Sequence, residues 1–171
     1  MIDRVLIDTF NIRARDFAIK WKDKLRAAPQ LKHYHLMEDE AIIDTGIPIF
    51  RMFSTVLDRG LDTNRIGELF VEKGKQRLLA GFPISEVIYG LNVAQKVVIE
   101  SVMTEFAPES SIRMYQSLGV LNTVSEFFLL GSMYVIKGFM EESYARMSSD
   151  EKANLEMFKK YFRDDFFFKK N

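Results

Sequence analysis

The sequence predicts an all-α, single-domain protein, a bundle of about six helices with a long C-terminal helical segment. Three observations support this prediction. Apolar residues recur at spacings of three and four through most of the 171 residues. No segment alternates apolar and polar residues for long enough to indicate a strand. The length suits one domain, and a hydrophobic fraction of 47% is enough to fill one core.

The first predicted helix covers residues 2–27, where apolar side chains at helical spacing are separated by Arg and Lys, and it ends before Pro29. Residues 30–37 have no clear period and are interpreted as an irregular connector. They contain both histidines, His33 and His35, which at a spacing of two share a face only in an extended segment. A metal site would need further ligands, so we interpret these histidines as partly exposed loop residues.

The second predicted helix runs from residue 38 to about Gly60 and begins with three acidic residues, which suit the positive end of a helix dipole. Pro48 lies inside it and removes a backbone N–H. We therefore expect a kink or a break at residues 45–47. Gly60 is expected to end the helix in a left-handed conformation.

The third and fourth predicted helices meet at a sharp corner. Asn64 is a candidate N-cap for the third helix, which covers residues 65–80 and ends at Gly81. Pro83 suits the first turn of the fourth helix, and Pro108 ends it. The fourth helix has a regular apolar stripe and is expected to face the core.

A long helix is predicted from Ser110 or Ser111 onward, and between residues 118 and 139 it is apolar on more than one side. Such a helix is expected to lie at the centre of the bundle. The domain is expected to cover residues 1–147. Residues 148–171 are expected to form a separate amphipathic helix that is rich in aromatic residues and begins at a Ser-x-x-Glu cap.

The composition argues against several functions. Lys and Arg number 24, as do Asp and Glu, so the charge gives no reason to expect a nucleic-acid partner. The absence of cysteine excludes disulfides, thiolate metal sites and a cysteine nucleophile. The uncharged, strongly apolar run of residues 127–136 is short for a bilayer. We expect a cytoplasmic protein with no transmembrane segment and no cofactor.

Three basic residues near the end of the third predicted helix, Lys73, Lys75 and Arg77, form a candidate docking surface for an acidic partner or an anion. The alternative is a solvated helix face whose last-turn cations suit the helix dipole. The sequence leaves both readings open.

Small and aromatic residues in the second half of the chain are candidates for helix crossing or dimerisation. Gly131 and Gly138 are seven residues apart and allow another helix to approach closely, within the core or, less favoured, across a dimer seam. Phe162 and Phe166 belong to the aromatic tail, which either docks on the core or exposes an apolar face for self-association.

A family resemblance links several of these features. The residues that support it are Trp21, Pro29, Tyr34, Arg51-Met52-Phe53-Ser54, Leu57-Asp58, Ile66-Gly67, Gly74-Lys75-Gln76-Arg77 and Gly81-Phe82-Pro83-Ile84-Ser85-Glu86-Val87-Ile88. This pattern resembles the N-terminal sensory domain of the RsbRD type, which is found in co-antagonists of the RsbT kinase and in related bacterial signalling proteins. The likeness covers residues 5–106 and is looser in residues 126–139.

The resemblance implies a globin-like helical module that usually lacks haem, forms a homodimer and passes a signal to a C-terminal output domain. It supplies no catalytic residue. The output domain lies outside the sequence, so we expect either a fragment of a longer protein or a protein that acts by docking on other signalling components.

The leading hypothesis is therefore a non-enzymatic bacterial stress-sensing domain that acts through dimerisation and through binding of a ligand or a signalling partner. A core rich in Phe and Met favours an apolar, fatty-acid-like small ligand. One alternative is a haem or gas sensor of globin type, although no histidine follows His35 to serve as a mid-chain axial ligand. A carboxylate or tyrosine enzyme is the other alternative, for which the sequence offers no specific motif.

Overall fold

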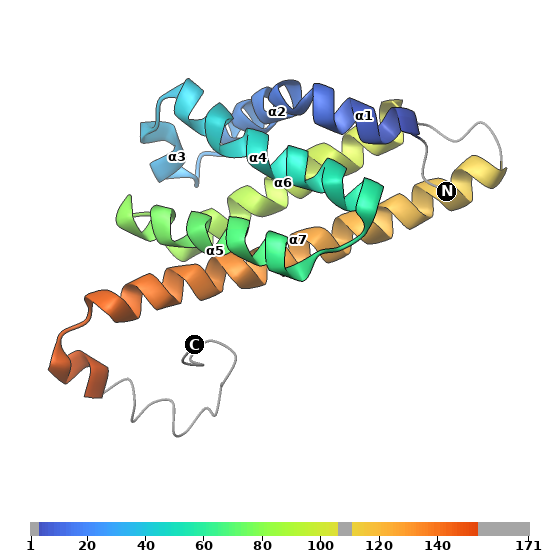
Figure 1. Ribbon diagram of the computed structural model, residues 1–171. Coiled ribbons are helices and arrows are strands. Elements are labelled where there is room, and N and C mark those ends of the chain that lie inside the picture. The colour runs from blue at the N-terminus through green and yellow to red at the C-terminus, as the bar shows by residue number, and fades with distance from the viewer. Residues whose placement is uncertain (1–3, 106–110, 154–171) are drawn as a thin grey trace.

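The computed structural model describes residues 4–105 and 111–153, and these residues form a helical bundle without a strand among them (Figure 1). The helices are α1 Arg4–Ile12, α2 Ala14–Ala27, α3 Lys32–Leu36, α4 Asp39–Arg59, α5 Thr63–Leu79, α6 Ile84–Glu105 and α7 Ser111–Arg146. Residues 149–153 are also helical. The all-α, single-domain prediction is confirmed.

Helix α7 is the longest element and runs along one side of the bundle (Figure 1). Helix α5 packs against α7 more extensively than any other pair of described helices, and α6 also lies against α7. Helices α1 and α2 cover α4, and α2 also contacts α6. The core therefore lies between the α1, α2 and α4 layer and the α5, α6 and α7 layer.

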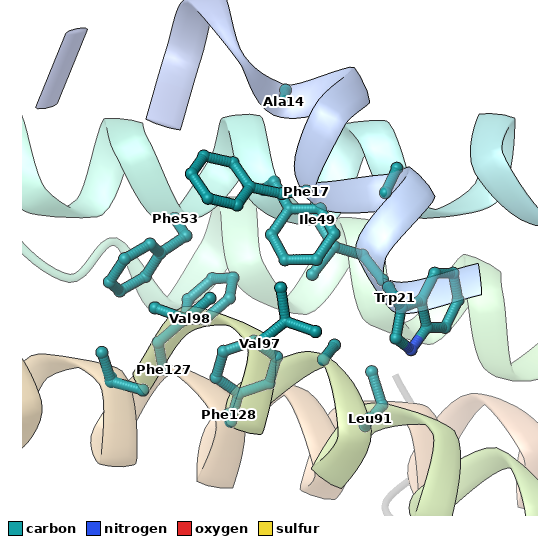
Figure 2. Close-up of a cluster of buried hydrophobic side chains, with 14 of the residues drawn as sticks. Ala14, Phe17, Trp21, Ile49, Phe53, Leu91, Val97, Val98, Phe127 and Phe128 are labelled. Atoms are coloured by element: carbon teal, nitrogen blue, oxygen red, sulfur yellow. The ribbon is translucent and has the colours of Figure 1, made fainter. Parts of the chain in front are cut away.

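A chain of phenylalanine rings fills this core. The rings of Phe10 and Phe17 stack with centroids 4.5 Å apart, and Phe10 meets Phe53 edge-on at 5.1 Å. Phe53 and Phe70 each lie 5.5 Å from Phe127 of α7. Figure 2 shows Phe17, Phe53 and Phe127 within one buried cluster. Each aromatic pair contributes about 1 kcal/mol beyond the area it buries, so the rings fix five helices against one another.

The first predicted helix is divided. Arg13 has φ −95° and ψ 20° and separates α1 from α2, which were predicted as one element over residues 2–27. The N–H of Arg13 still donates to Thr9 O at 2.9 Å, and Phe17 N–H donates to Arg13 O at 3.1 Å. Because these hydrogen bonds continue across Arg13, α1 and α2 meet at a bend and are not separated by a loop.

Residues 30–37 are more ordered than predicted, because residues 32–36 form α3. Tyr34 is the buried residue of this short helix. Arg26 of α2 holds the segment by donating from Nη1 to Tyr34 O at 2.8 Å and from Nη2 to Met37 O. A helix of five residues has no period long enough to be recognised in the sequence, so the connector prediction was wrong here.

Helix α4 continues through Pro48, so the expected break at residues 45–47 is absent. Pro48 has no N–H to donate to Asp44 O, the carbonyl four residues before it. Lys73 of α5 donates from Nζ to the next carbonyl, Thr45 O, at 2.8 Å. Helix α5 is therefore tied to α4 in the turn before Pro48.

The structure confirms the two helix ends that were predicted at glycine residues. Gly60 follows α4 with φ +86°, and Gly81 follows α5 with φ +78°, both in the region that side chains disfavour. The N-cap of α5 differs from the prediction, because Asp62 and not Asn64 occupies it. Asp62 Oδ1 accepts from the backbone N–H groups of Asn64 at 3.1 Å and Arg65 at 3.2 Å.

Helices α5 and α7 cross with their backbones in contact. A Cβ atom added to Gly138 would lie 2.0 Å from Val71 O, and one added to Gly74 would lie 2.1 Å from Val135 O. Gly131, the other glycine singled out in α7, faces the ring of Phe70, where an added Cβ would lie 2.9 Å from ring carbons. In this chain, both Gly131 and Gly138 therefore lie toward α5.

The segment after α7 begins with a reciprocal cap. Ser148 N–H donates to Glu151 Oε2 at 2.7 Å, and Glu151 N–H donates to Ser148 Oγ at 3.3 Å. This is the capping box predicted from the sequence. Phe162 and Phe166 lie outside the described residues.

The segment Tyr115–Arg146 of α7 is long and apolar enough to cross a membrane by length and composition alone. The central helix of a soluble bundle meets the same criteria. Val120, Val124 and Phe127 bury one side of α7 in the core, whereas Leu118 and Leu129 are exposed. The expectation that this helix lies at the centre of the bundle was therefore wrong, because α5 and α6 cover only one side of it.

Candidate ligand site

Arg77 is a buried arginine in the last turn of α5, with 8% of its surface exposed. Its guanidinium carbon lies 5.0 Å from the ring centre of Tyr34 and 4.6 Å from that of Phe82. Nη1 donates to the sulfur of Met37 at 3.0 Å. Nη2 is buried and has no hydrogen-bond partner among residues 4–105 and 111–153.

These contacts offset only part of the free-energy cost of burying the guanidinium charge. Cation–π contacts with Tyr34 and Phe82 are favourable, but a thioether is a weak acceptor. A buried donor without a partner costs about 1–3 kcal/mol. Burial accordingly lowers the pKa of Arg77, although an arginine side chain remains protonated. Arg77 is therefore the group in this core that most lacks an anionic partner.

Lys73 lies one helical turn before Arg77 and is half-buried. Its Nζ donates to Thr45 O at 2.8 Å. Burial, with a smaller effect of the Arg77 charge, lowers the pKa of the Lys73 amine to about 8. The neutral amine is consequently populated near physiological pH, which is unusual for lysine.

A small cavity joins these two cations to apolar walls. The volume open to the centre of a water molecule is about 20 Å³, which is room for one water. The lining comes from six helices and consists of Trp21, Tyr34, Thr45, Ile49, Lys73, Arg77, Val87, Leu91 and Val135. Trp21 points toward α6 (Figure 2), where its Nε1 donates to Gly90 O at 2.8 Å.

Lys73 also lines a shallow surface groove between α4 and α5, beside Asp44, Thr45 and Glu72. Lys73 and Thr45 therefore line both the groove and the inner cavity.

The three basic residues predicted as one docking surface occupy different environments. Arg77 is buried, Lys73 binds a backbone carbonyl, and Lys75 forms an ion pair with Glu141 of α7 at 3.4 Å. The expected common exposed surface is absent. The physical reason is the period of α5, in which Ile66, Phe70, Gly74 and Arg77 share the buried side.

The histidines hold α3 against the site. His33 Nδ1 lies 2.9 Å from Glu86 Oε1, and the backbone N–H of His33 donates to Glu86 Oε2 at 2.9 Å. His35 Nε2 lies 3.1 Å from Leu25 O. In the part of the chain that the structure describes, no three His, Asp or Glu side chains are placed to hold a metal ion. The interpretation of both histidines as loop residues was wrong, because they anchor a helix.

Sequence reasoning did not assign Trp21 or Tyr34 to a site, although both residues supported the family resemblance. Burial of Tyr34 raises the pKa of its hydroxyl, and the nearby Arg77 charge opposes that shift. The sequence signal that could have identified Arg77 as a buried residue is the stripe formed by Ile66, Phe70, Gly74 and Arg77 on α5. A charged residue in phase with an apolar stripe indicates a buried charge and not a solvated one.

Comparison with known proteins identifies the family. A model described as the histidine kinase N-terminal domain matches residues 3–141. No curated protein matches this sequence. No solved structure matches it either. The matched segment includes all of α1 to α6 and most of α7, so every residue that lines the cavity lies within it. The chain therefore belongs to the family of histidine kinase N-terminal domains, which are sensory domains of signal transduction.

Proposed function

We propose that this sensory domain responds to an apolar carboxylate, whose anionic head binds Arg77 and whose hydrocarbon part lies against the walls of the cavity. One observation carries the proposal, the buried and unpartnered Nη2 of Arg77. A carboxylate accepts from a guanidinium through short, charge-assisted hydrogen bonds. Apart from Lys73, Thr45 and the Tyr34 hydroxyl, the remaining walls are hydrocarbon or aromatic.

The same ligand would act on the helices around it. The cavity has room for one water, so a longer ligand requires α4 and α5 to separate along the groove. A second cation, Lys73, lines the same cavity and is hydrogen-bonded to Thr45 O of α4. Ligand binding is thereby coupled to α4 and to the packing of α5 on α7, and such a coupling is what a sensor requires.

We also propose that the domain functions as a cytoplasmic homodimer, as the RsbRD-type, globin-like resemblance implies. Leu118 and Leu129 of α7 support this proposal, because their exposed fractions are 57% and 63%. They are eleven residues apart, which places them on the same side of a helix. Sedimentation velocity tests this part, with Leu129→Glu expected to give a monomer and a wild-type monomer contradicting it.

Thermal unfolding tests the ligand. Fatty carboxylates of increasing chain length are added to the wild-type protein, with alcohols of matched length as the control. We expect the carboxylates to raise Tm and the alcohols to have a much smaller effect. Arg77→Met should remove the difference, whereas Lys75→Met should keep it. Equal shifts for acids and alcohols would refute an anion site.

A further inference from the structure

Lys73 combines three properties that rarely coincide in a lysine. Its amine is half-buried, and its side chain lines both a surface groove and an internal cavity. A second cation with an unused donor, Arg77, is one helical turn away. The proposed function uses Arg77 as the anion-binding group and leaves the nucleophilicity of Lys73 without a role.

We propose that the Lys73 amine reacts reversibly with carbon dioxide to form a carbamate, which is held by the guanidinium of Arg77. The nitrogen lone pair of the neutral amine attacks the carbon of carbon dioxide and forms an N–C bond, while one C–O π pair moves to oxygen. The nitrogen then loses a proton to buffer. The product is a carbamate anion and one proton, without an oxidant, a reductant or a metal.

The surroundings of Lys73 suit this product. A carbamate keeps one N–H, so the bond to Thr45 O need not be lost. Its two oxygens accept hydrogen bonds, and Arg77 Nη2 is a buried donor that lacks one. A negative group beside Arg77 replaces the repulsion between two cations with an attraction. Ile49, Val87 and Val135 line the same cavity and limit the access of water.

Selectivity for Lys73 follows from its acidity. Burial lowers the pKa of this amine from 10.5 to about 8. Near neutral pH its neutral fraction is therefore roughly 300-fold larger than that of an ordinary lysine. The other titratable groups around it are Asp44 of α4, Glu68 and Glu72 of α5, Tyr34 of α3 and Arg77, and the lining residues from α2, α6 and α7 are uncharged.

This inference rests on the proposed function in one respect, that Arg77 is an anion-binding group. The carbamate is a second anion that Arg77 can bind, and it is formed on a side chain of the protein. A carbamate on Lys73 and an external carboxylate would compete for Arg77. Carbon dioxide would then change the apparent affinity of the domain for its apolar ligand.

Carbon-13 NMR of the full chain tests the proposal. The protein is labelled with nitrogen-15 at lysine and exposed to carbon-13 carbon dioxide and bicarbonate between pH 6.5 and 9. We expect one dominant carbamate carbon coupled to a lysine nitrogen, with an occupancy that rises with pH over this range at fixed carbon dioxide. The nitrogen label separates this signal from a carbamate on the N-terminal amine.

Matched variants assign the signal. Lys73→Arg keeps a donor for Thr45 O and cannot form the carbamate, so it should lose the signal, whereas Lys75→Arg should retain it. Arg77→Met should lower the carbamate occupancy several-fold. A signal that persists in Lys73→Arg, or no lysine carbamate in the wild-type protein, would overturn the inference. If carboxylates still raise Tm in that case, only the carbamate has failed. A Lys73 carbamate without any carboxylate effect would refute the proposed ligand and support the carbamate.

Discussion

The backbone contact between α5 and α7 leaves no room for a methyl group at Gly138 or Gly74. In Gly138→Ala the new Cβ would lie 2.0 Å from Val71 O, against an ordinary contact of at least 3.4 Å. The methyl group must therefore withdraw by about 1.4 Å. The obstacle is the backbone of α5, which has no rotamer to change, so the two helices must move apart.

The expected cost follows from that separation. Overpacking a close contact costs about 1–3 kcal/mol, and a gap of 0.5–1 Å loses about a quarter to a half of each dispersion contact along the interface. Replacing glycine by alanine in a helix interior by itself raises the free energy of unfolding by about 1 kcal/mol. The net loss in free energy of unfolding should be about 1–2 kcal/mol. Gly74→Ala, whose Cβ would lie 2.1 Å from Val135 O, should lose a similar amount.

Gly119 supplies the matched control. It lies in the same helix, and a Cβ there meets nothing within 4 Å. Gly119→Ala should therefore stabilise the protein by about 1 kcal/mol through helix propensity alone. Urea unfolding followed by circular dichroism measures both variants, and an unchanged m-value makes them comparable. If Gly138→Ala were as stable as Gly119→Ala, the backbone contact between α5 and α7 would be wrong.

Two further predictions concern the charged site and a helix cap. The unfolded chain binds more protons than the folded one between the lowered pKa of Lys73, about 8, and its ordinary value of 10.5. The free energy of unfolding should accordingly rise with pH, by about 2 kcal/mol between pH 8 and 10. Lys73→Met should flatten that rise in urea unfolding and Lys75→Met should not, while a rise that survives in Lys73→Met would show that another group titrates. Asp62→Ala should lower the free energy of unfolding by about 1 kcal/mol, because two backbone N–H groups lose their acceptor. Asn64→Ala should cost less, and the reverse order would restore Asn64 as the cap.

The helices were predictable where local signals agree. Gly60, Gly81 and Pro83 mark ends and beginnings that any tertiary structure has to respect, and the structure places helix ends at all three. The continuity of α4 through Pro48 was not predictable, because an interior proline usually kinks or ends a helix and only tertiary packing decides whether the helix continues. The same holds for α3, which is fixed by Arg26 of the preceding helix and by Glu86 of α6.

The sequence allowed only part of the candidate site to be predicted. Lys73 and Arg77 were recognised as a cationic pair, but a single sequence does not reveal whether a basic residue faces water or the core. The apolar stripe on α5 favoured burial of Arg77, while its place in the last helical turn favoured a solvated cation. Packing decided between the two, because α3 brings Tyr34 over the guanidinium.

The central claim is that Arg77 binds the anionic head of a ligand, and the single tryptophan offers a direct test of it. Trp21 is buried and lines the same cavity as Arg77, so its fluorescence reports on that space. The measurement is a fluorescence titration of the wild-type protein and of Arg77→Met with a fatty carboxylate, after circular dichroism has shown that both are folded. Saturable quenching or a spectral shift in the wild-type protein, weakened at least tenfold in Arg77→Met, is the predicted result. Equal affinity in the two proteins would contradict the account.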